Sequence, residues 1–247
     1  EGELSSYLVD ITAHILTVQD PETGNALVDM IAPIAGSKGT GMWTVQEALA
    51  LGVPLPTIAQ AVFARDLSAK SDERTAAKER YGCEHAPFTG SDRAAFLEAI
   101  RQALYASKIC SYAQGFALLK TASERYDWNL DLGGIALLFR GGCIIRAAFL
   151  ERIAEAYRAP QPPANLLMDD YFAGKLAAYQ PAWRQVVTTA AASGVAAPAF
   201  SASLAYFDGY RDAEGPMNLL QAQRDCFGAH TYRRTDKEGS FHFDWLG

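Results

Sequence analysis

Residues 36–43, Gly-Ser-Lys-Gly-Thr-Gly-Met-Trp, combine residue types that suit the binding of an anion. Three glycines within six positions favour a loop, because each glycine inside a helix costs about 1 kcal/mol relative to alanine. Glycine lets backbone N–H groups approach a ligand, while Lys38 supplies an ammonium group and Thr40 a hydroxyl. The alternative is a glycine-rich turn with a solvated lysine. The loop is not a P-loop, whose lysine follows the last glycine, and G-x-G-x-x-G occurs nowhere in the chain.

A second cationic candidate, Arg65, lies in a helix predicted over residues 57–70. At about 100° per residue, Arg65 falls within about 20° of Ile58 and about 60° of Val62, on an apolar stripe. A buried arginine needs an anionic partner. The alternative is that its long stem reaches solvent or pairs with a structural carboxylate.

Arg224 and His230 are placed at one helix end by the sequence Leu-Leu-Gln-Ala-Gln-Arg-Asp-Cys-Phe-Gly-Ala-His over residues 219–230. A helix is predicted over 218–227, with Gly228 as the residue that ends it. Arg224 then lies in the last turn and His230 just beyond, so both can point to one side. Alone, Arg224 is also explained by the helix dipole, and His230 by a surface loop.

These strings carry a family resemblance. Residues 31–43, IAPIAGSKGTGMW, resemble the signature of the 6-phosphogluconate dehydrogenases, with Pro33 in place of the usual aspartate. The strings QAQRDCFGAHTY over 221–232 and AVFAR over 61–65 resemble two more segments of that family, and further matches follow in the same order along the chain. The resemblance implies that Lys38, Thr40 and Arg65 bind the substrate phosphate. It also implies that the other subunit of a homodimer lends Arg224 and His230.

The family's reaction implies what else the enzyme needs. Hydride passes from 6-phosphogluconate to NADP, and loss of carbon dioxide and reprotonation yield ribulose 5-phosphate. The proton transfers are made by a lysine and a glutamate in a K-x-x-H-N-x-x-E pattern, which is absent from this sequence. We therefore expect a C-terminal portion, inactive alone and without catalytic residues, with NADP bound mainly by an N-terminal domain. The start at Glu1 without methionine agrees with this expectation.

Two other functions stay open at this stage. One is a non-catalytic sugar-phosphate binding or dimerisation module. The other is a helical domain of a related β-hydroxyacid dehydrogenase, although that group usually lacks a long C-terminal arm. An upstream G-x-G-x-x-G segment followed by K-x-x-H-N-x-x-E would decide for the enzyme.

Composition limits the partners and the compartment. A formal net charge of −6 argues against binding of nucleic acid or an anionic membrane, and no apolar run is long enough to span a bilayer. Four widely spaced cysteines without a C-x-x-C pair predict reduced thiols and a cytoplasmic protein. Cys83-x-His85 is too sparse for zinc, and Asp169-Asp170 is read as a helix cap, so we expect no metal site.

The periodicity of apolar residues predicts an all-α fold, an antiparallel multi-helix bundle over residues 1–228. Ser91 is the expected cap of the longest helix. The predicted helices cover residues 4–18, 26–34, 43–51, 57–70, 91–126, 170–180, 182–193, 198–210 and 218–227, with two short buried helices within 131–146.

The last segment, residues 229–247, is predicted to be an extended arm. Phe241, Phe243 and Trp245 alternate with polar residues and form one aromatic edge, which must be covered by the chain's own helices or by another subunit. The family resemblance favours the partner subunit, and hence a homodimer with exchanged arms. His242 has no evident partner in the sequence.

Overall fold

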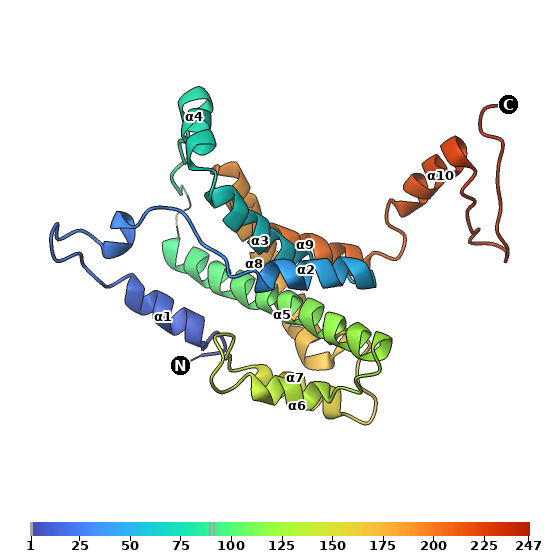
Figure 1. Ribbon diagram of the computed structural model, residues 1–247, viewed down its shortest axis with the longest axis horizontal. Helices are drawn as coiled ribbons and strands as arrows, with labels where there is room; N and C mark the ends of the chain where they lie inside the picture. Colours follow the sequence, from blue (N-terminus) through green and yellow to red (C-terminus); the bar gives the residue numbers. More distant parts are fainter. Residues whose placement is uncertain (1, 89, 91) are drawn as a thin grey trace. The chain divides into compact units, whose positions relative to one another are not determined.

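The structure, a computed structural model, describes residues 2–88, 90 and 92–247 and confirms the all-α class. Among these residues the regular elements are helices, and β-pairing is limited to isolated bridges (Figure 1). The elements are α1 (Tyr7–Ile15), η1 (Leu27–Met30), α2 (Thr40–Leu51), α3 (Pro56–Ser68), α4 (Ser71–Tyr81), α5 (Arg93–Arg125), α6 (Leu132–Leu138), α7 (Leu150–Arg158), η2 (Leu166–Met168), α8 (Asp170–Ala192), α9 (Pro198–Arg211) and α10 (Met217–Gly228).

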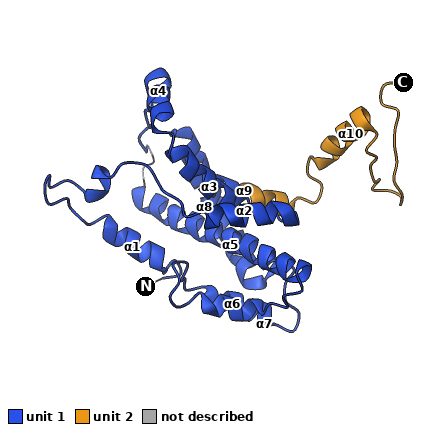
Figure 2. Ribbon diagram, viewed as in Figure 1, with its two compact units in different colours: residues 1–204 blue, residues 205–247 orange. Residues whose placement is uncertain are grey.

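The chain forms two compact units, Glu1–Leu204 and Ala205–Gly247 (Figure 2). The predicted division into residues 1–228 and 229–247 has its boundary within unit 2, and it stays a prediction.

Helix α5 is the axis of unit 1, and α2, α3, α6, η2 and α8 all contact it (Figure 1). Its 33 residues bury apolar side chains along its length, among them Ile109 and Phe116. The Asp92 side chain caps the helix by accepting a hydrogen bond from the Ala95 N–H. The predicted cap, Ser91, lies outside the described residues.

Helices α5 and α8 run antiparallel. Phe96, near the start of α5, lines the same cavity as Thr189, near the end of α8. Further along α5, the Tyr105 hydroxyl lies 3.0 Å from the hydroxyl of Tyr171, at the start of α8. The predicted antiparallel arrangement is therefore present in this pair.

Helices α2 and α3 form a hairpin beside α5. A Cβ atom at Gly41 would lie 3.0 Å from the Val62 side chain, so glycine allows the close approach of α2 to α3. Gln114, at 0% exposure on α5, accepts a hydrogen bond from the Thr57 N–H at 3.0 Å and donates one to the Thr57 hydroxyl at 2.9 Å. These bonds satisfy an otherwise unpaired first-turn N–H of α3 and fix that helix to the centre of unit 1.

Several predicted elements were wrong. Residues 26–34 form only the short η1, because Pro33 lacks an N–H and disfavours helix in the residue before it. Within 131–146 only α6 forms; it ends at Leu138, and Gly142, with a φ of 67°, prevents a second helix from running through its position. The predicted break at Pro181 does not occur: α8 is continuous, with Leu176 and Trp183 buried on either side of the proline.

Two helices were missed. Helix α4 has no buried residue and no apolar stripe, so periodicity could not find it. Its acidic first turn and basic last turn, which favour the helix dipole, were the available signal. Helix α7 follows directly on the segment that was predicted to hold two other helices.

Lys108 on α5 is an unpaired charge inside unit 1. Its Nζ atom is buried without a hydrogen-bond partner among residues 2–88, 90 and 92–247, and it lies 5.3 Å from the centroid of the Phe149 ring. Burial lowers the pKa of this ammonium group below 10.5. The charged form therefore destabilises the fold at neutral pH.

We expect Lys108→Met to raise the free energy of unfolding at pH 7 by about 1 kcal/mol, because the variant keeps the apolar stem and removes the unpaired charge. The folded-state pKa is the lower one, so the penalty is complete well below it and disappears as pH rises above the unfolded value. Urea unfolding at several pH values measures this. Lys120→Met on the same helix is the control and should change stability by less than about 0.5 kcal/mol.

Unit 2 contains α10 and the C-terminal arm. Ala229, with a φ of 49°, takes the left-handed conformation that ends α10, whereas Gly228 is still helical. The prediction of Gly228 as the terminating residue was therefore wrong by one position. The arm folds back on itself, with reciprocal backbone hydrogen bonds of 2.8 Å between Tyr232 and Phe241.

Candidate substrate-binding site

The glycine-rich loop is held in place by the end of α3 and by α4. The Ser68 hydroxyl accepts a hydrogen bond from the Ala35 N–H at 2.9 Å, and the Arg74 guanidinium donates to the Pro33 carbonyl at 3.3 Å. A third bond runs from Arg65 Nη2 to the Gly36 carbonyl at 2.7 Å. All three bonds act on backbone groups of residues 33–36, so the entry to the loop is held through its main chain.

Arg65 is thereby brought to the loop that carries Lys38 and Thr40. Of the two possibilities left open for Arg65, the structure shows the one in which the side chain reaches solvent, since it is exposed. An exposed guanidinium needs no buried counter-anion, because water solvates it. One nitrogen is bonded to Gly36, and the remaining N–H groups have no partner among the described residues.

Thr40 begins α2, and Gly39 precedes it in a left-handed conformation with a φ of 92°. The Gly39 N–H donates to the Ser37 hydroxyl at 3.2 Å, which tightens the turn. The first N–H groups of a helix have no partner within the helix. At this end of α2, the exposed Lys38 ammonium and Thr40 hydroxyl make no hydrogen bond with any described residue. The arrangement offers charged and neutral donors to one anion.

Arg224 and His230 both lie in unit 2. Both are exposed, and Arg224 donates a hydrogen bond to Gln221 one turn earlier at 3.3 Å. The His230 ring lies over Gly228, where a Cβ atom would come within 2.8 Å of its Nε2 atom, and its centroid is 5.8 Å from that of Phe227. Arg224 therefore lies in the last turns of α10 and His230 just past its end, and it stays a prediction that the two side chains point to one side. Their proximity to Lys38, Thr40 and Arg65 stays a prediction.

Three residues that position the glycine-rich loop and the end of α10 were not singled out from the sequence. Ser68 and Arg74 hold the loop, and Asp225 organises the end of α10. Arg74 sits in a highly charged stretch that hides a single structural arginine. Asp225 was detectable in principle, because an acidic residue in the last turn of a helix opposes the helix dipole and calls for another explanation.

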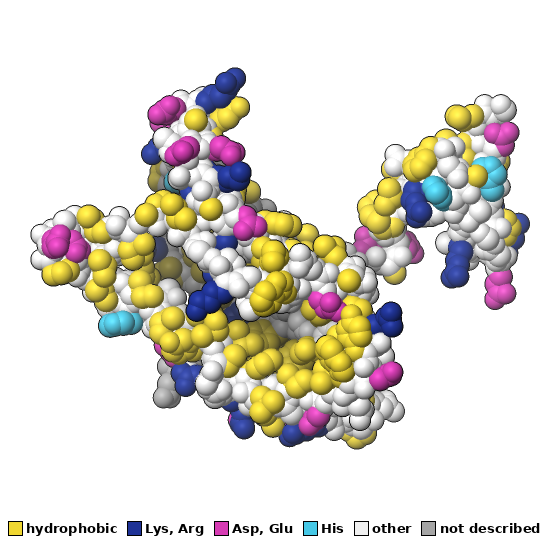
Figure 3. All heavy atoms as spheres, viewed as in Figure 1, with side chains coloured by type: hydrophobic (Ala, Val, Ile, Leu, Met, Phe, Trp, Pro, Cys, Tyr) yellow, Lys and Arg dark blue, Asp and Glu magenta, His cyan; other side chains and the backbone are white. Residues whose placement is uncertain are grey.

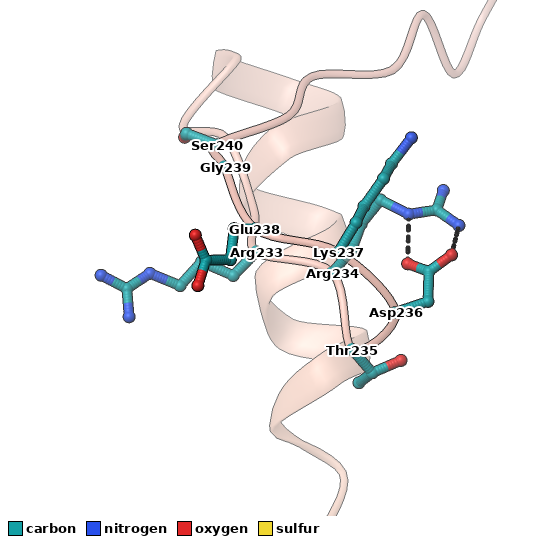
Figure 4. A pocket seen from close by; sticks show the side chains of 8 residues that line it. All are labelled: Arg233, Arg234, Thr235, Asp236, Lys237, Glu238, Gly239 and Ser240. Atoms are coloured by element: carbon teal, nitrogen blue, oxygen red, sulfur yellow. Dashed lines mark hydrogen bonds and ion pairs between the residues drawn. The ribbon is translucent and has the colours of Figure 1, made fainter.

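A cavity of about 720 Å³ lies elsewhere, at the turn of the arm, and is lined by residues 233–240. Figure 4 shows the Arg234 guanidinium facing the Asp236 carboxylate, with both bonds at 2.7 Å. This pairing neutralises Arg234. None of the candidate residues lines this cavity, and we assign it no ligand.

Further observations concern metal sites, membrane-spanning helices and the cysteines. Among the described residues, no cluster of three or more potential metal ligands is present, and no helix is both long and apolar enough to cross a membrane. The Cys83 sulfur lies 4.0 Å from His85 Nε2. The four cysteines are unpaired thiols: Cys83 and Cys226 are exposed, Cys143 is half-buried and Cys110 is buried. His242, for which no partner was expected, contacts Asp225.

Comparison with known proteins decides the family. Residues 1–245 match the family model described as "6-phosphogluconate dehydrogenase, C-terminal domain". The chain belongs to the 6-phosphogluconate dehydrogenase family. It is similar to the NADP(+)-dependent, decarboxylating 6-phosphogluconate dehydrogenase of Bacillus subtilis, with 57% identity over 247 residues, covering 100% of this chain and 52% of that protein.

The Escherichia coli decarboxylating 6-phosphogluconate dehydrogenase is 54% identical over 245 residues, which cover 99% of this chain and 52% of the relative. A solved structure of the Plasmodium falciparum 6-phosphogluconate dehydrogenase superposes with a TM-score of 0.95 at 47% identity, covering 99% of this chain and 52% of that chain. That enzyme was solved in its apo form, with its cofactor NADP+ and with its substrate 6-phosphogluconate. The chain thus spans about half the length of these family members.

Proposed function

We propose that this chain is the substrate-binding and dimer-forming portion of an NADP-dependent, decarboxylating 6-phosphogluconate dehydrogenase of the pentose phosphate pathway. The complete enzyme would convert 6-phosphogluconate to ribulose 5-phosphate. The family membership supports the reaction class, and the names of the relatives from B. subtilis and E. coli support decarboxylation. A cytoplasmic location belongs to the proposal and is supported by the four unpaired thiols.

The observation that carries the proposal is the hydrogen bond from Arg65 to the Gly36 carbonyl. It joins α3 to the loop, although Arg65 is 29 residues from Gly36, and it sets a guanidinium beside the segment that carries Lys38. A phosphate dianion requires several charge-assisted donors at fixed angles, and a planar guanidinium supplies two of them. We propose that Lys38, Thr40 and Arg65 hold the phosphate of 6-phosphogluconate.

Arg224 and His230 are proposed to reach the substrate of a second copy, with the arm exchanged between the subunits of a homodimer. Support comes from α10, whose apolar side chains are strongly exposed: Met217 at 65%, Leu219 at 64% and Phe227 at 74%. Apolar side chains grouped on one short helix favour burial against a protein surface. In unit 1, Figure 3 shows hydrophobic side chains gathered around α2 and α5, where Trp43 and Leu49 are exposed.

NADP is proposed to bind mainly to a part of the enzyme outside this chain. The sequence has no G-x-G-x-x-G turn, and the described residues form no parallel sheet on which such a turn could sit. The described residues therefore lack the strand-turn-helix unit on which this type of dinucleotide site is built. The lysine and glutamate that transfer protons are likewise expected in the other half of the enzyme.

The proposal is tested by comparing this chain with a full-length protein that contains it. We expect the full-length protein to produce NADPH and carbon dioxide when 6-phosphogluconate and NADP are supplied, and this chain alone to produce neither. Full-length protein that binds 6-phosphogluconate without forming NADPH would instead favour the non-catalytic binding module. NADPH formation by this chain alone would contradict the assignment of the catalytic groups to the other half.

A further inference from the structure

Asp225 is a buried carboxylate that binds four donors. Its Oδ1 atom accepts hydrogen bonds from the Thr231 N–H and from His242 Nδ1, both at 2.9 Å. Its Oδ2 atom accepts from the Phe243 N–H at 3.1 Å and from the Trp245 indole N–H at 2.8 Å. The side chain has an exposed fraction of 0%. It is therefore a fully satisfied buried anion, which is uncommon and needs an explanation.

The four donors come from two stretches that are distant along the arm, residue 231 and residues 242–245. Asp225 thus ties the start and the end of the arm to the last turn of α10. Burial alone raises the pKa of the Asp225 carboxyl, but the bonds from Trp245, His242 and the two backbone N–H groups outweigh burial and lower the pKa to about 2. The tether is therefore charged throughout the neutral range.

Thr231 connects this tether to the candidate site, because it directly follows His230. Besides the bond to Asp225, its carbonyl accepts a hydrogen bond from Gln221 at 2.5 Å, and its hydroxyl accepts one from Ser240 at 2.8 Å. Both residues that flank His230 are in the left-handed region, with φ values of 49° for Ala229 and 60° for Thr231. This conformation is unfavourable for residues other than glycine and persists only where surrounding contacts enforce it.

We propose that Asp225 is a positioning residue for substrate recognition: it holds Thr231, and through it the backbone bend that places the His230 ring over Gly228, at the end of the helix that also carries Arg224. This inference rests on the proposed function, because it assumes that Arg224 and His230 contact 6-phosphogluconate. It adds a residue that touches no substrate. In this arrangement, α10 and the arm hold Arg224 and His230 in place before the substrate binds. Binding then does not have to supply the free energy of ordering these side chains.

The test is Asp225→Asn in the full-length enzyme. Asparagine has nearly the same shape, but either orientation of its amide turns an N–H group toward at least one of the donors from Thr231, Phe243 and Trp245. We expect the KM for 6-phosphogluconate to rise roughly ten- to one-hundredfold, comparable with the loss of one charge-assisted hydrogen bond. The KM for NADP should stay within about twofold, since no proposed NADP contact is altered.

Two further sets of variants keep the inference testable if Asp225→Asn does not fold. His242→Asn keeps an N–H donor near the place of Nδ1, whereas His242→Ala removes it, so the alanine variant should show the larger rise in KM for 6-phosphogluconate. Asp244→Asn is the matched control, because among the described residues its carboxylate accepts only from the Gly247 N–H, at 3.2 Å, and it should behave like the parent enzyme.

The outcomes separate the two proposals. Parent enzyme that forms no NADPH from 6-phosphogluconate contradicts the proposed function. If the parent enzyme is active, a second outcome overturns the positioning role: Asp225→Asn and His242→Ala lower kcat but change neither KM. Asp225 would then be a purely structural anchor. A selective rise in the KM for 6-phosphogluconate, reproduced by His242→Ala and absent in Asp244→Asn, supports it.

Discussion

Arg65→Ala in the full-length enzyme is expected to raise the KM for 6-phosphogluconate by roughly one hundred- to one thousandfold, which corresponds to about 3–4 kcal/mol of binding. The change removes a guanidinium from the proposed phosphate site and also removes the hydrogen-bond donor of the Gly36 carbonyl. Both changes are expected to weaken binding of the substrate phosphate. Initial-rate measurements with 6-phosphogluconate and NADP varied separately give the two KM values.

Two variants make this prediction specific. Arg65→Lys keeps the charge but loses the planar fork, so part of the affinity should be lost. Arg80→Ala removes the same charge from α4, where the guanidinium contacts only the Tyr81 ring among described residues, and it should change the KM less than twofold. Equal effects of Arg65→Ala and Arg80→Ala would show that only overall charge matters, contrary to a local phosphate site.

Gln114→Leu is expected to lower the free energy of unfolding by about 2–4 kcal/mol. Leucine fits the volume but leaves both the Thr57 N–H and the Thr57 hydroxyl without their partner in a buried place, and each unpaired group costs about 1–3 kcal/mol. Because Thr57 starts the helix that ends near Arg65 and Ser68, the loop should loosen as well. Urea-induced unfolding followed by circular dichroism measures the loss.

The control for this variant is Gln102→Leu on the same helix. The Gln102 amide bonds to Glu98 at 2.9 Å on an exposed face, and water can replace that contact. A change of less than about 0.5 kcal/mol is expected there. If Gln114→Leu and Gln102→Leu lowered the free energy of unfolding by similar amounts, the buried hydrogen bonds with Thr57 would contribute no more to stability than the exposed bond does.

The fold class was predictable because apolar residues recur at helical spacing, and the long α5 and the proline-initiated α3 were placed within two residues at each end. Two of the errors, at Pro181 and at α4, depend on how the helices pack. Pro181 is compatible with a helix because buried residues on both sides hold α8 together. Helix α4 has no face against the core, and this removes the periodic signal altogether.

The candidate site was predictable as a set of residue types, since the loop, Arg65 and the end of α10 all carry recognisable strings. The contacts that shape it were not. Whether Arg65 is buried or exposed depends on the neighbours of α3, which one helical wheel cannot supply. The role of Asp225 depends on donors up to 20 residues away along an irregular arm, and no local pattern encodes such pairings.

Hydrogen bonds to the main chain, and not to side chains, hold the entry to the glycine-rich loop, and this limits what a substitution there can change. Because Arg65, Ser68 and Arg74 grip main-chain atoms at Pro33, Ala35 and Gly36, the identity of the side chains at positions 33 and 35 contributes little to the grip. A substitution at position 33 or 35 leaves the backbone groups that Ser68 and Arg74 bind in place. Pro33, where the family resemblance predicts aspartate, keeps its carbonyl and with it the hydrogen bond from Arg74.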